Sequence, residues 1–504
     1  MYRLTNSEFE RRASAMRFFL SALLALAFSA LAQPTIKSPW FGIHVIDEAT
    51  GQGIPLIELR TVNDVRVITD NAGWAAFHEP GLMDREVWFY LSHHPGYERG
   101  KDGFGYEGAR LKTTQGGSAD LKLKRTNIAQ RIARLTGQGL YRDSELLGLP
   151  CALPNLNPAG IMGQDSVQAV PYAGKIFWLW GDTNVPHHPL GNFQTTSAFT
   201  PLALKPEQGI AFDYLTDDTR PDKLRHMLPI QDQGAVWLFG LLTIKNVQGK
   251  ETMLAHYSRH LGLDNAVEHG LARFDEAKGH FVVLKQLDKE NAWRFPRGHA
   301  VQAGEFFYFS DSFLHTRVQA RWADLISPDH YEALRYDETA HEWCWQREQP
   351  PTTQHDETRL LLKSIMPDKD ARYRLRDLAT GKLVRVHGSS VQWNAHRQRW
   401  VMIAVQSGDR DTPSPLGEVW YAEAETPEGP WTKAVKVASH PRYSFYNPIH
   451  HGFLDADGGR TIYFEGTYTL EFSGNPYAPS RYNYNQLMYR LDLDDERMKA
   501  VRAE

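Results

Sequence analysis

Two aspartates flank a segment with the pattern of a tight hairpin, where they could share acid–base chemistry. Asp165 precedes the turn Pro171-Tyr-Ala-Gly174 and Asp182 follows it, 17 positions after Asp165. If Val170 pairs with Lys175 across this turn, the two carboxylates become diagonal neighbours on one side of the hairpin, about 7–8 Å apart. One carboxyl with a raised pKa could then donate a proton while the other activates water.

The segment around Asp165 is repeated along the chain. The same strand–turn–strand pattern returns at Gly298-His-Ala-Val-Gln302 and at Gly388-Ser-Ser-Val-Gln392, and looser copies begin near Arg225 and Tyr446. The unit starts are 58–90 residues apart, which leaves room for four strands and their loops in each unit. Radially repeated four-stranded units are typical of a β-propeller. We therefore predict an all-β fold in which residues 160–504 form a five-bladed propeller.

The repeat starts should face one shared pocket, because the innermost strand of each propeller blade begins at the funnel that binds ligands. This pooling of residues that are far apart in the sequence is the physical argument for a site there. The residues expected to bind substrate are Arg225, His226, His299, Ser389, Tyr446, Asn447 and His450.

The first and last repeats resemble a known group of enzymes. Gln164-Asp-Ser and Ile176-Phe-Trp-Leu-Trp-Gly-Asp-Thr183 look like the first blade of five-bladed glycoside hydrolases of the arabinanase and xylosidase type, nearest the endo-D-arabinanase-like group. The stretch from Tyr446 to Leu491 is similar to that group's closing blade. The resemblance implies hydrolysis of a glycosidic bond in a polysaccharide or oligosaccharide, of arabinan or xylan type, with Asp165 and Asp182 as the acid–base pair.

The same resemblance implies a third acid in a later blade. The candidates are Asp311, Glu418 and Glu465, and we prefer Glu465 as a third catalytic residue because it ends an apolar strand just before Gly466. An acid pair at the spacing expected above favours inversion, which needs about 6.5–9.5 Å, over retention, which needs about 5–5.5 Å. No cofactor is expected, although a structural Ca²⁺ in the propeller channel is left open.

The N-terminal third of the chain predicts a smaller β domain. Short strands such as Phe41–Asp47 and Trp74–Phe77 alternate with turns rich in Gly, Pro and Asp. Thr50-Gly-Gln-Gly-Ile-Pro55 and Thr69-Asp-Asn-Ala-Gly73 resemble transthyretin-like, carboxypeptidase-regulatory-like sandwich modules, which are usually accessory. We therefore expect a β-sandwich over residues 33–125.

A connector follows the predicted sandwich. Ile128, Ile132 and Leu135 have the spacing of one face of a short helix, and a proline-rich loop comes next. This predicts a helical connector and loop over residues 126–159.

The first 32 residues predict a signal peptide. Arg11, Arg12 and Arg17 precede an apolar run that is too short for a stable membrane span, and Ala30-Leu-Ala32 is a cleavage pattern. A secreted or periplasmic protein with no integral membrane segment is expected. Removing residues 1–32 takes away four basic and two acidic residues, which leaves 52 and 58 and a net charge of −6. Nucleic acid is therefore a poor candidate partner.

Two other functions remain open at this point. A glycan-binding protein without catalytic activity would keep the aromatic funnel and would not need both aspartates. A polysaccharide lyase would need a base and a group that neutralises a uronate, for which His226, His299, Tyr446 and Arg225 are available. If both aspartates are purely structural, Asp182 would cap a turn and Asp165 would form an ion pair with Arg225 or Arg297.

Overall fold

The computed structural model describes residues 38–153, 159–186, 195–217, 220–287, 289–294, 298–476 and 483–502. The predicted signal peptide lies outside these ranges. Nearly all regular structure is β, which confirms the all-β prediction. The described helices are short: α2 (Arg142–Leu146), α3 (Trp322–Leu325), α4 (Gln354–Leu362) and α5 (Lys499–Arg502). Among the described residues, no helix is long and apolar enough to cross a membrane.

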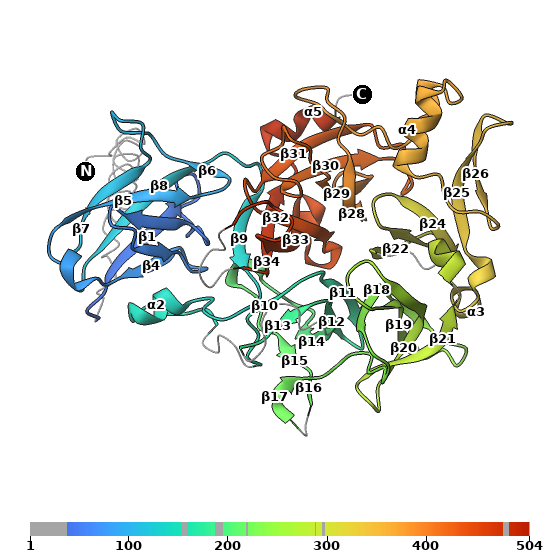
Figure 1. Cartoon of the computed structure of the whole chain (residues 1–504), viewed down its shortest axis with the longest axis horizontal. Coiled ribbons are helices and arrows are strands. Elements are labelled where there is room, and N and C mark those ends of the chain that lie inside the picture. Colours follow the sequence, from blue (N-terminus) through green and yellow to red (C-terminus); the bar gives the residue numbers. More distant parts are fainter. Residues whose placement is uncertain are drawn as a thin grey trace, which may run out of the picture.

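Two four-stranded sheets form the N-terminal part of the molecule, at the left of Figure 1. In β5, Val87, Phe89 and Leu91 are buried and alternate with more exposed neighbours, as expected for a strand with one covered face. Side chains from both sheets share one apolar core. The first sheet contains β4 (Trp74–Phe77), β1 (Phe41–Asp47), β8 (Ser118–Arg125) and β6 (Tyr97–Glu98); the second contains β3 (Arg66–Ile68), β2 (Glu58–Thr61), β5 (Glu86–His93) and β7 (Gly108–Lys112).

Five sheets of four or five strands follow, lie around a common centre in Figure 1 and make up the larger part of the molecule. Their innermost strands contact one another in chain order. In spatial order they are β11 (Gln168–Tyr172), β12 (Lys175–Trp180), β14 (Thr196–Pro201) and β15 (Asp213–Tyr214); β18 (Ala235–Lys245), β19 (Glu251–His260), β20 (Ala266–Asp275) and β21 (His280–Leu287); β22 (His299–Ala303), β23 (Phe306–Ser310), β24 (Leu314–Gln319), β25 (Glu332–Asp337) and β26 (Glu342–Gln346); β28 (Val386–Asn394), β29 (Arg399–Gln406), β30 (Glu418–Ala424), β31 (Lys433–Ser439) and β27 (Arg376–Asp377); and β32 (Ser444–His450), β33 (Thr461–Thr469), β34 (Asn485–Asp492) and β9 (Gln130–Arg134).

Two small ladders complete the described strands: β10 (Gly163–Gln164) with β13 (Thr183–Asn184), and β16 (Thr216–Asp217) with β17 (Arg220–Leu224). The sheets pack face to face, which explains the unbroken apolar run of β12. Phe177 packs in the cluster shared with the second large sheet, and Trp178 packs in the cluster shared with the last one. A strand covered on both faces needs apolar side chains at every position. The arrangement fits the predicted propeller, and the number of blades stays a prediction.

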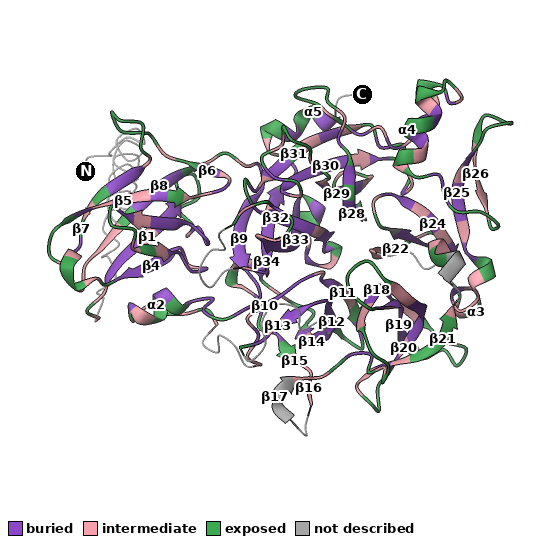
Figure 2. Ribbon diagram, viewed as in Figure 1, coloured by how far each residue is buried: buried purple, intermediate pink, exposed green. Residues whose placement is uncertain are grey.

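The predicted connector helix is wrong, because residues 130–134 form the strand β9. This strand pairs antiparallel with β34 and completes the last large sheet. All five of its residues are buried, and Figure 2 shows it in purple beside β32–β34. The apolar spacing of Ile128, Ile132 and Leu135 fits a helix, but a short helix by itself is only marginally stable. Pairing with the open edge of β34 gives the backbone of this segment hydrogen-bond partners in a sheet instead.

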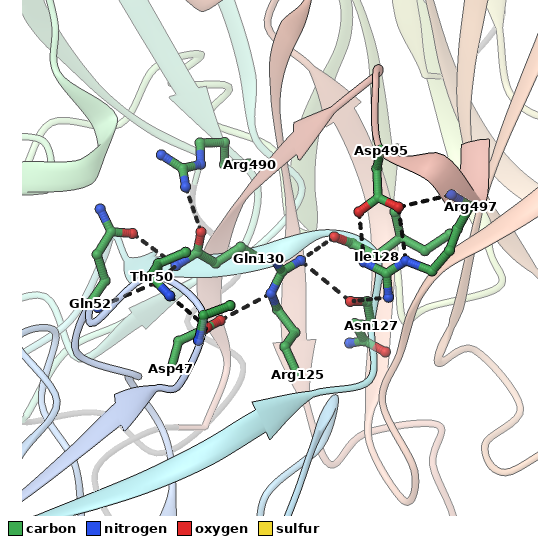
Figure 3. Close-up of polar contacts among 11 residues, drawn as sticks. Asp47, Thr50, Gln52, Arg125, Asn127, Ile128, Gln130, Arg490, Asp495 and Arg497 are labelled. Carbon is green, nitrogen blue, oxygen red and sulfur yellow. Dashed lines mark hydrogen bonds and ion pairs between the residues drawn. The ribbon is translucent and has the colours of Figure 1, made fainter. Parts of the chain in front are cut away.

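Polar side chains join the N-terminal sheets to the larger ring, as Figure 3 shows. Gln130 Nε2 of β9 donates to Gln52 Oε1 at 2.8 Å. Arg125 at the end of β8 is held by Asp47 of the same sheet, Nε to Oδ2 at 3.0 Å, and its Nη1 donates to the Ile128 carbonyl just before β9. Arg490 Nη2 in turn donates to Gln130 Oε1 at 2.7 Å. The strand that closes the ring is therefore also the strand that holds the N-terminal sheets.

Candidate active site

A cavity of about 630 Å³ opens where the inner strands begin. Six of the residues predicted for the site line it, namely Asp165, Asp182, His299, Ser389, Tyr446 and Asn447. This volume suits a small molecule or a short segment of an oligosaccharide. The full lining is Asp165, Ser166, Gln168, Gly181, Asp182, Trp237, Leu238, Phe239, Leu263, Gly298, His299, Asp311, His387, Gly388, Ser389, Leu416, Tyr446, Asn447, Glu471, Phe472 and Tyr484.

The two aspartates lie directly opposite each other, so the register predicted for the hairpin is wrong. Tyr172 pairs with Lys175, and the turn consists of Ala173 and Gly174 alone. Both turn residues have positive φ, which is the geometry of a tight two-residue turn. The register shifts by two residues, and the Asp165 N–H donates to the Asp182 carbonyl at 3.1 Å.

A single tyrosine bridges the two carboxylates. Tyr484 Oη lies 3.0 Å from Asp165 Oδ2 and 3.1 Å from Asp182 Oδ2. These two carboxylate oxygens therefore cannot be more than 6.1 Å apart, the sum of the two distances. At these two oxygens the pair is closer than the diagonal spacing of about 7–8 Å expected from the sequence. Inverting enzymes have roughly 6.5–9.5 Å between their carboxyl groups and retaining enzymes roughly 5–5.5 Å.

The two carboxylates have different hydrogen-bond partners. Asp165 Oδ2 also accepts from the Tyr446 hydroxyl at 2.6 Å, and Asp165 Oδ1 accepts from the Asp182 backbone N–H at 2.8 Å. Asp182 Oδ1 accepts from Trp237 Nε1 at 2.9 Å. Three donors favour the ionised form of Asp165, because each of these bonds stabilises negative charge on its oxygens.

Burial raises the pKa of both carboxyls. For Asp182 the pKa rises to about 7, first through burial and then through the charge of Asp165. For Asp165 burial also raises the pKa, against the hydrogen bonds of Tyr446, the Asp182 backbone and Tyr484. The coupled pair therefore retains one proton at mildly acid to neutral pH.

The number of donors to each carboxylate favours a proton on Asp182, because Asp165 has two donors besides Tyr484 and Asp182 has one. The Tyr484 hydroxyl has one proton and can donate it to only one of its two carboxylate neighbours. If it donates to Asp165, the contact with Asp182 needs a proton on Asp182 Oδ2. Every polar atom in the chain Asp182–Tyr484–Asp165 is then satisfied, with Asp182 as the acid and Asp165 as the anion.

The residue before Asp182 must be small. A Cβ at Gly181 would lie 2.6 Å from Asp165 Oδ1 and 3.3 Å from Ser166 Cβ. The Gly-Asp-Thr sequence therefore has a steric reason, since only glycine lets the Asp165 carboxylate lie against the backbone that precedes Asp182.

The cavity lining includes both exposed apolar side chains and acidic side chains. Phe472 and Leu263 are each 59% exposed and line the cavity. Glu471 and Asp311 add acidic side chains, and no lysine or arginine is among the lining residues in the described ranges. His299 is uncharged at neutral pH, because burial and the nearby His451 lower its pKa to about 3.

Four residues predicted for the site lie away from the cavity lining. Arg225 donates to the backbone carbonyls of Thr216 and Lys278, and His226 is exposed outside the lining. His450 is buried, and its Nε2 lies 2.8 Å from Asp455 Oδ1. The preference for Glu465 as the third acid is not supported, because its carboxylate is buried 2.6 Å from His451 Nε2.

Several lining residues were absent from the sequence-based set: Tyr484, Trp237, Glu471 and Phe472. Tyr484 follows the last loop of the closing repeat and Trp237 lies in the second repeat, but neither stands at a repeat start. Of the two other candidates for the third acid, Asp311 lines the cavity and Glu418 does not, since its carboxylate contacts Ser439 and Lys436. The described residues contain no group of three or more His, Cys, Asp or Glu that could hold a metal ion.

No protein-family model matches the chain, and no curated protein sequence matches it. Among solved structures, a candidate hydrolase from Bacteroides ovatus aligns with 66% of this chain and 86% of its own, at 13% identity and a TM-score of 0.43. An exo-1,5-α-L-arabinanase from a bovine ruminal metagenomic library aligns with 67% of this chain and 96% of its own, at 10% identity and a TM-score of 0.35. A GH43_1 enzyme from Xanthomonas citri aligns with 66% and 88%, at 12% identity and a TM-score of 0.33. At these values the chemistry of the site rests on its own geometry.

Proposed function

We propose that this protein is an exported glycoside hydrolase that cleaves an uncharged glycan with retention of anomeric configuration. The observation that carries the proposal is the pair Asp165–Asp182, bridged by Tyr484 in a cavity. One carboxyl keeps a proton near neutral pH and the other is held as an anion by three donors. A distance of at most 6.1 Å between the two oxygens that contact Tyr484 supports the short carboxyl spacing of retaining enzymes, roughly 5–5.5 Å, over that of inverting enzymes.

The reaction would take two steps. Asp165 attacks the anomeric carbon while the glycosidic C–O bond breaks, and Asp182 transfers its proton to the leaving oxygen. A glycosyl ester on Asp165 results. Asp182, now ionised, then takes a proton from water as that water attacks the anomeric carbon, and Asp165 leaves as a carboxylate. Activity is expected to fall above pH 7, because the pKa of Asp182 is about 7 and the first step needs its proton.

The cavity favours an uncharged substrate. Asp311 and Glu471 would repel a uronate, the described lining contains no lysine or arginine, and burial lowers the pKa of its two histidines, His299 and His387. Arg225 and His226, which a lyase could have used, lie off the lining. Phe472 offers an exposed ring on which a sugar could stack. Arabinan, xylan and galactan fragments are therefore the substrates to test first.

One observation favours the second candidate, a glycan-binding protein without catalytic activity. Both oxygens of Asp165 already accept hydrogen bonds within the protein, as a purely structural carboxylate would. In that case sugar binding would survive Asp165→Asn without any release of product.

The experiment is a release assay over arabinans, xylans, galactans and uronate-containing polysaccharides, with Asp165→Asn and Asp182→Asn in parallel. Reducing ends that are lost in both variants support the hydrolase. Unsaturated products would replace it with a lyase, and binding without release in all three proteins would replace it with a binding protein. Export is tested separately by the N-terminal mass of the secreted chain, which should begin at Gln33.

A further inference from the structure

Tyr484, which bridges the two aspartates, has an unusual backbone conformation. Its φ is +60°, in the left-handed region that residues other than glycine seldom adopt. Its carbonyl is also closely approached, since a Cβ at Gly163 would lie 2.3 Å from it. Such a conformation persists only where the surrounding structure holds it. The position of the Tyr484 hydroxyl therefore depends on its neighbours.

The next residue, Asn485, ties the chain on both sides of Tyr484. It is fully buried, and its Nδ2 donates to the Asn483 carbonyl at 2.8 Å and to the Met162 carbonyl at 3.3 Å. Its Oδ1 accepts from Arg134 Nη1 at 3.0 Å. The Asn485 amide thus links the residue before Tyr484, the segment that leads to Asp165, and an arginine of β9.

Arg134 in turn is held by the N-terminal sheets. Its backbone N–H donates to Asn71 Oδ1 at 2.9 Å, and Asn71 Nδ2 donates to the Arg134 carbonyl at 2.8 Å. Asn71 lies in the turn between β3 and β4 and is buried. Arg134 Nη2 donates to the Gln138 carbonyl at 2.8 Å, so the guanidinium is fixed at both of its amino groups.

We infer that Arg134 and Asn485 are positioning residues for Tyr484, and that Asn71 makes the N-terminal domain part of the active site. The inference rests on the proposed function in taking the Asp165–Asp182 pair as the catalytic pair. An accessory module would touch the catalytic domain only at its outer surface. Here one continuous set of hydrogen bonds runs from a turn of the N-terminal domain to the residue beside the bridging tyrosine.

The test follows the titration of the Asp182 carboxyl by ¹³C NMR of protein labelled at aspartate Cγ, with Asp182→Asn to assign the signal. The titratable groups that face Asp182 directly are Asp165 and Tyr484. Those elsewhere on the cavity lining are Asp311, Glu471, His299 and His387. All of them except Tyr484 remain in every variant. This measurement requires no turnover, so it is informative even if no glycan is cleaved and the proposed function fails.

Tyr484→Phe should raise the Asp182 midpoint by about one pH unit, because Asp182 accepts the Tyr484 proton once it is ionised, and the variant lacks this donor. Asn485→Ala should raise it in the same direction, and the double variant should show no further rise, because both changes remove the same bond. Asn71→Ala, farther from the cavity, should produce a smaller rise with the fold intact by circular dichroism. Asn394→Ala is the matched control, since Asn394 is also fully buried and donates to a backbone carbonyl, that of Gly459.

An unchanged midpoint in folded Asn485→Ala and Asn71→Ala overturns the inference. So do shifts in the double variant that equal the sum of the single shifts, or a shift in Asn394→Ala as large as that in Asn485→Ala.

Discussion

Gly181→Ala is the substitution whose effect on the active site follows most directly from the geometry. The new Cβ would lie 2.6 Å from Asp165 Oδ1, so the carboxylate must retreat by at least 0.4 Å to restore even a 3.0 Å contact. Gly181 does not have a positive φ, so alanine can adopt its backbone conformation and the clash alone is responsible. The displaced carboxylate would strain its 2.6 Å bond from Tyr446 and its 2.8 Å bond from the Asp182 N–H.

A misplacement of about 1 Å can cost about 100-fold in rate, so we expect kcat to fall by about 10- to 100-fold. Overpacking should cost about 1–3 kcal/mol of folding stability, which leaves the protein folded. The assay is steady-state kinetics on the polysaccharide that the release assay identifies, with a thermal melt of each variant. Gly452→Ala is the control, because its Cβ would meet nothing closer than 3.6 Å. If Gly181→Ala keeps kcat within twofold of the wild type, the reasoning about Asp165 is refuted.

Three further predictions concern stability and binding. Asp182→Asn should stabilise the protein more at pH 8 than at pH 4, because folding raises the pKa of Asp182 from 3.8 to about 7. The wild type therefore loses up to about 4 kcal/mol of folding stability as the pH rises through this range, and the variant does not. A difference in calorimetric Tm between variant and wild type that is the same at both pH values would contradict this. Phe472→Ala should raise KM by about tenfold with kcat nearly unchanged, because the exposed ring offers a stacking surface for a sugar and contacts neither aspartate by a hydrogen bond. An equal loss in kcat would contradict a binding role. A chain that begins at residue 126 should lack a cooperative melt by circular dichroism. The reason is that Leu56 and Ile68 of the N-terminal part pack in the apolar core of the last two large sheets. A melt like that of the full chain would instead show that these sheets fold independently.

The repeats predicted much of the site because their period reports which strand starts face a common centre. Three clear copies of the repeat have Asp165, His299 and Ser389 at equivalent positions, and all three residues line the cavity. The second copy was misaligned. Its inner strand begins at Ala235 rather than near Arg225, and Trp237, Leu238 and Phe239 of this strand line the cavity.

Other features depend on contacts that no local pattern encodes. The hairpin register was missed because Pro171 and Tyr172 read as turn residues, whereas they belong to β11 and the turn is only two residues long. Gly466 predicts a strand end directly after Glu465, but β33 continues to Thr469. Tyr484 immediately precedes the last strand, β34, and contacts the two aspartates of the first hairpin only when the ring of sheets closes.

The most direct test of the central claim is the mass of the protein during turnover. The enzyme is mixed with its oligosaccharide substrate, quenched in acid, and digested for peptide mass spectrometry. A retaining mechanism at this pair predicts a glycosyl adduct on the peptide that contains Asp165, enriched in Asp182→Asn when the leaving group does not need a proton. Turnover without any adduct, and with a first product of inverted configuration, would contradict it.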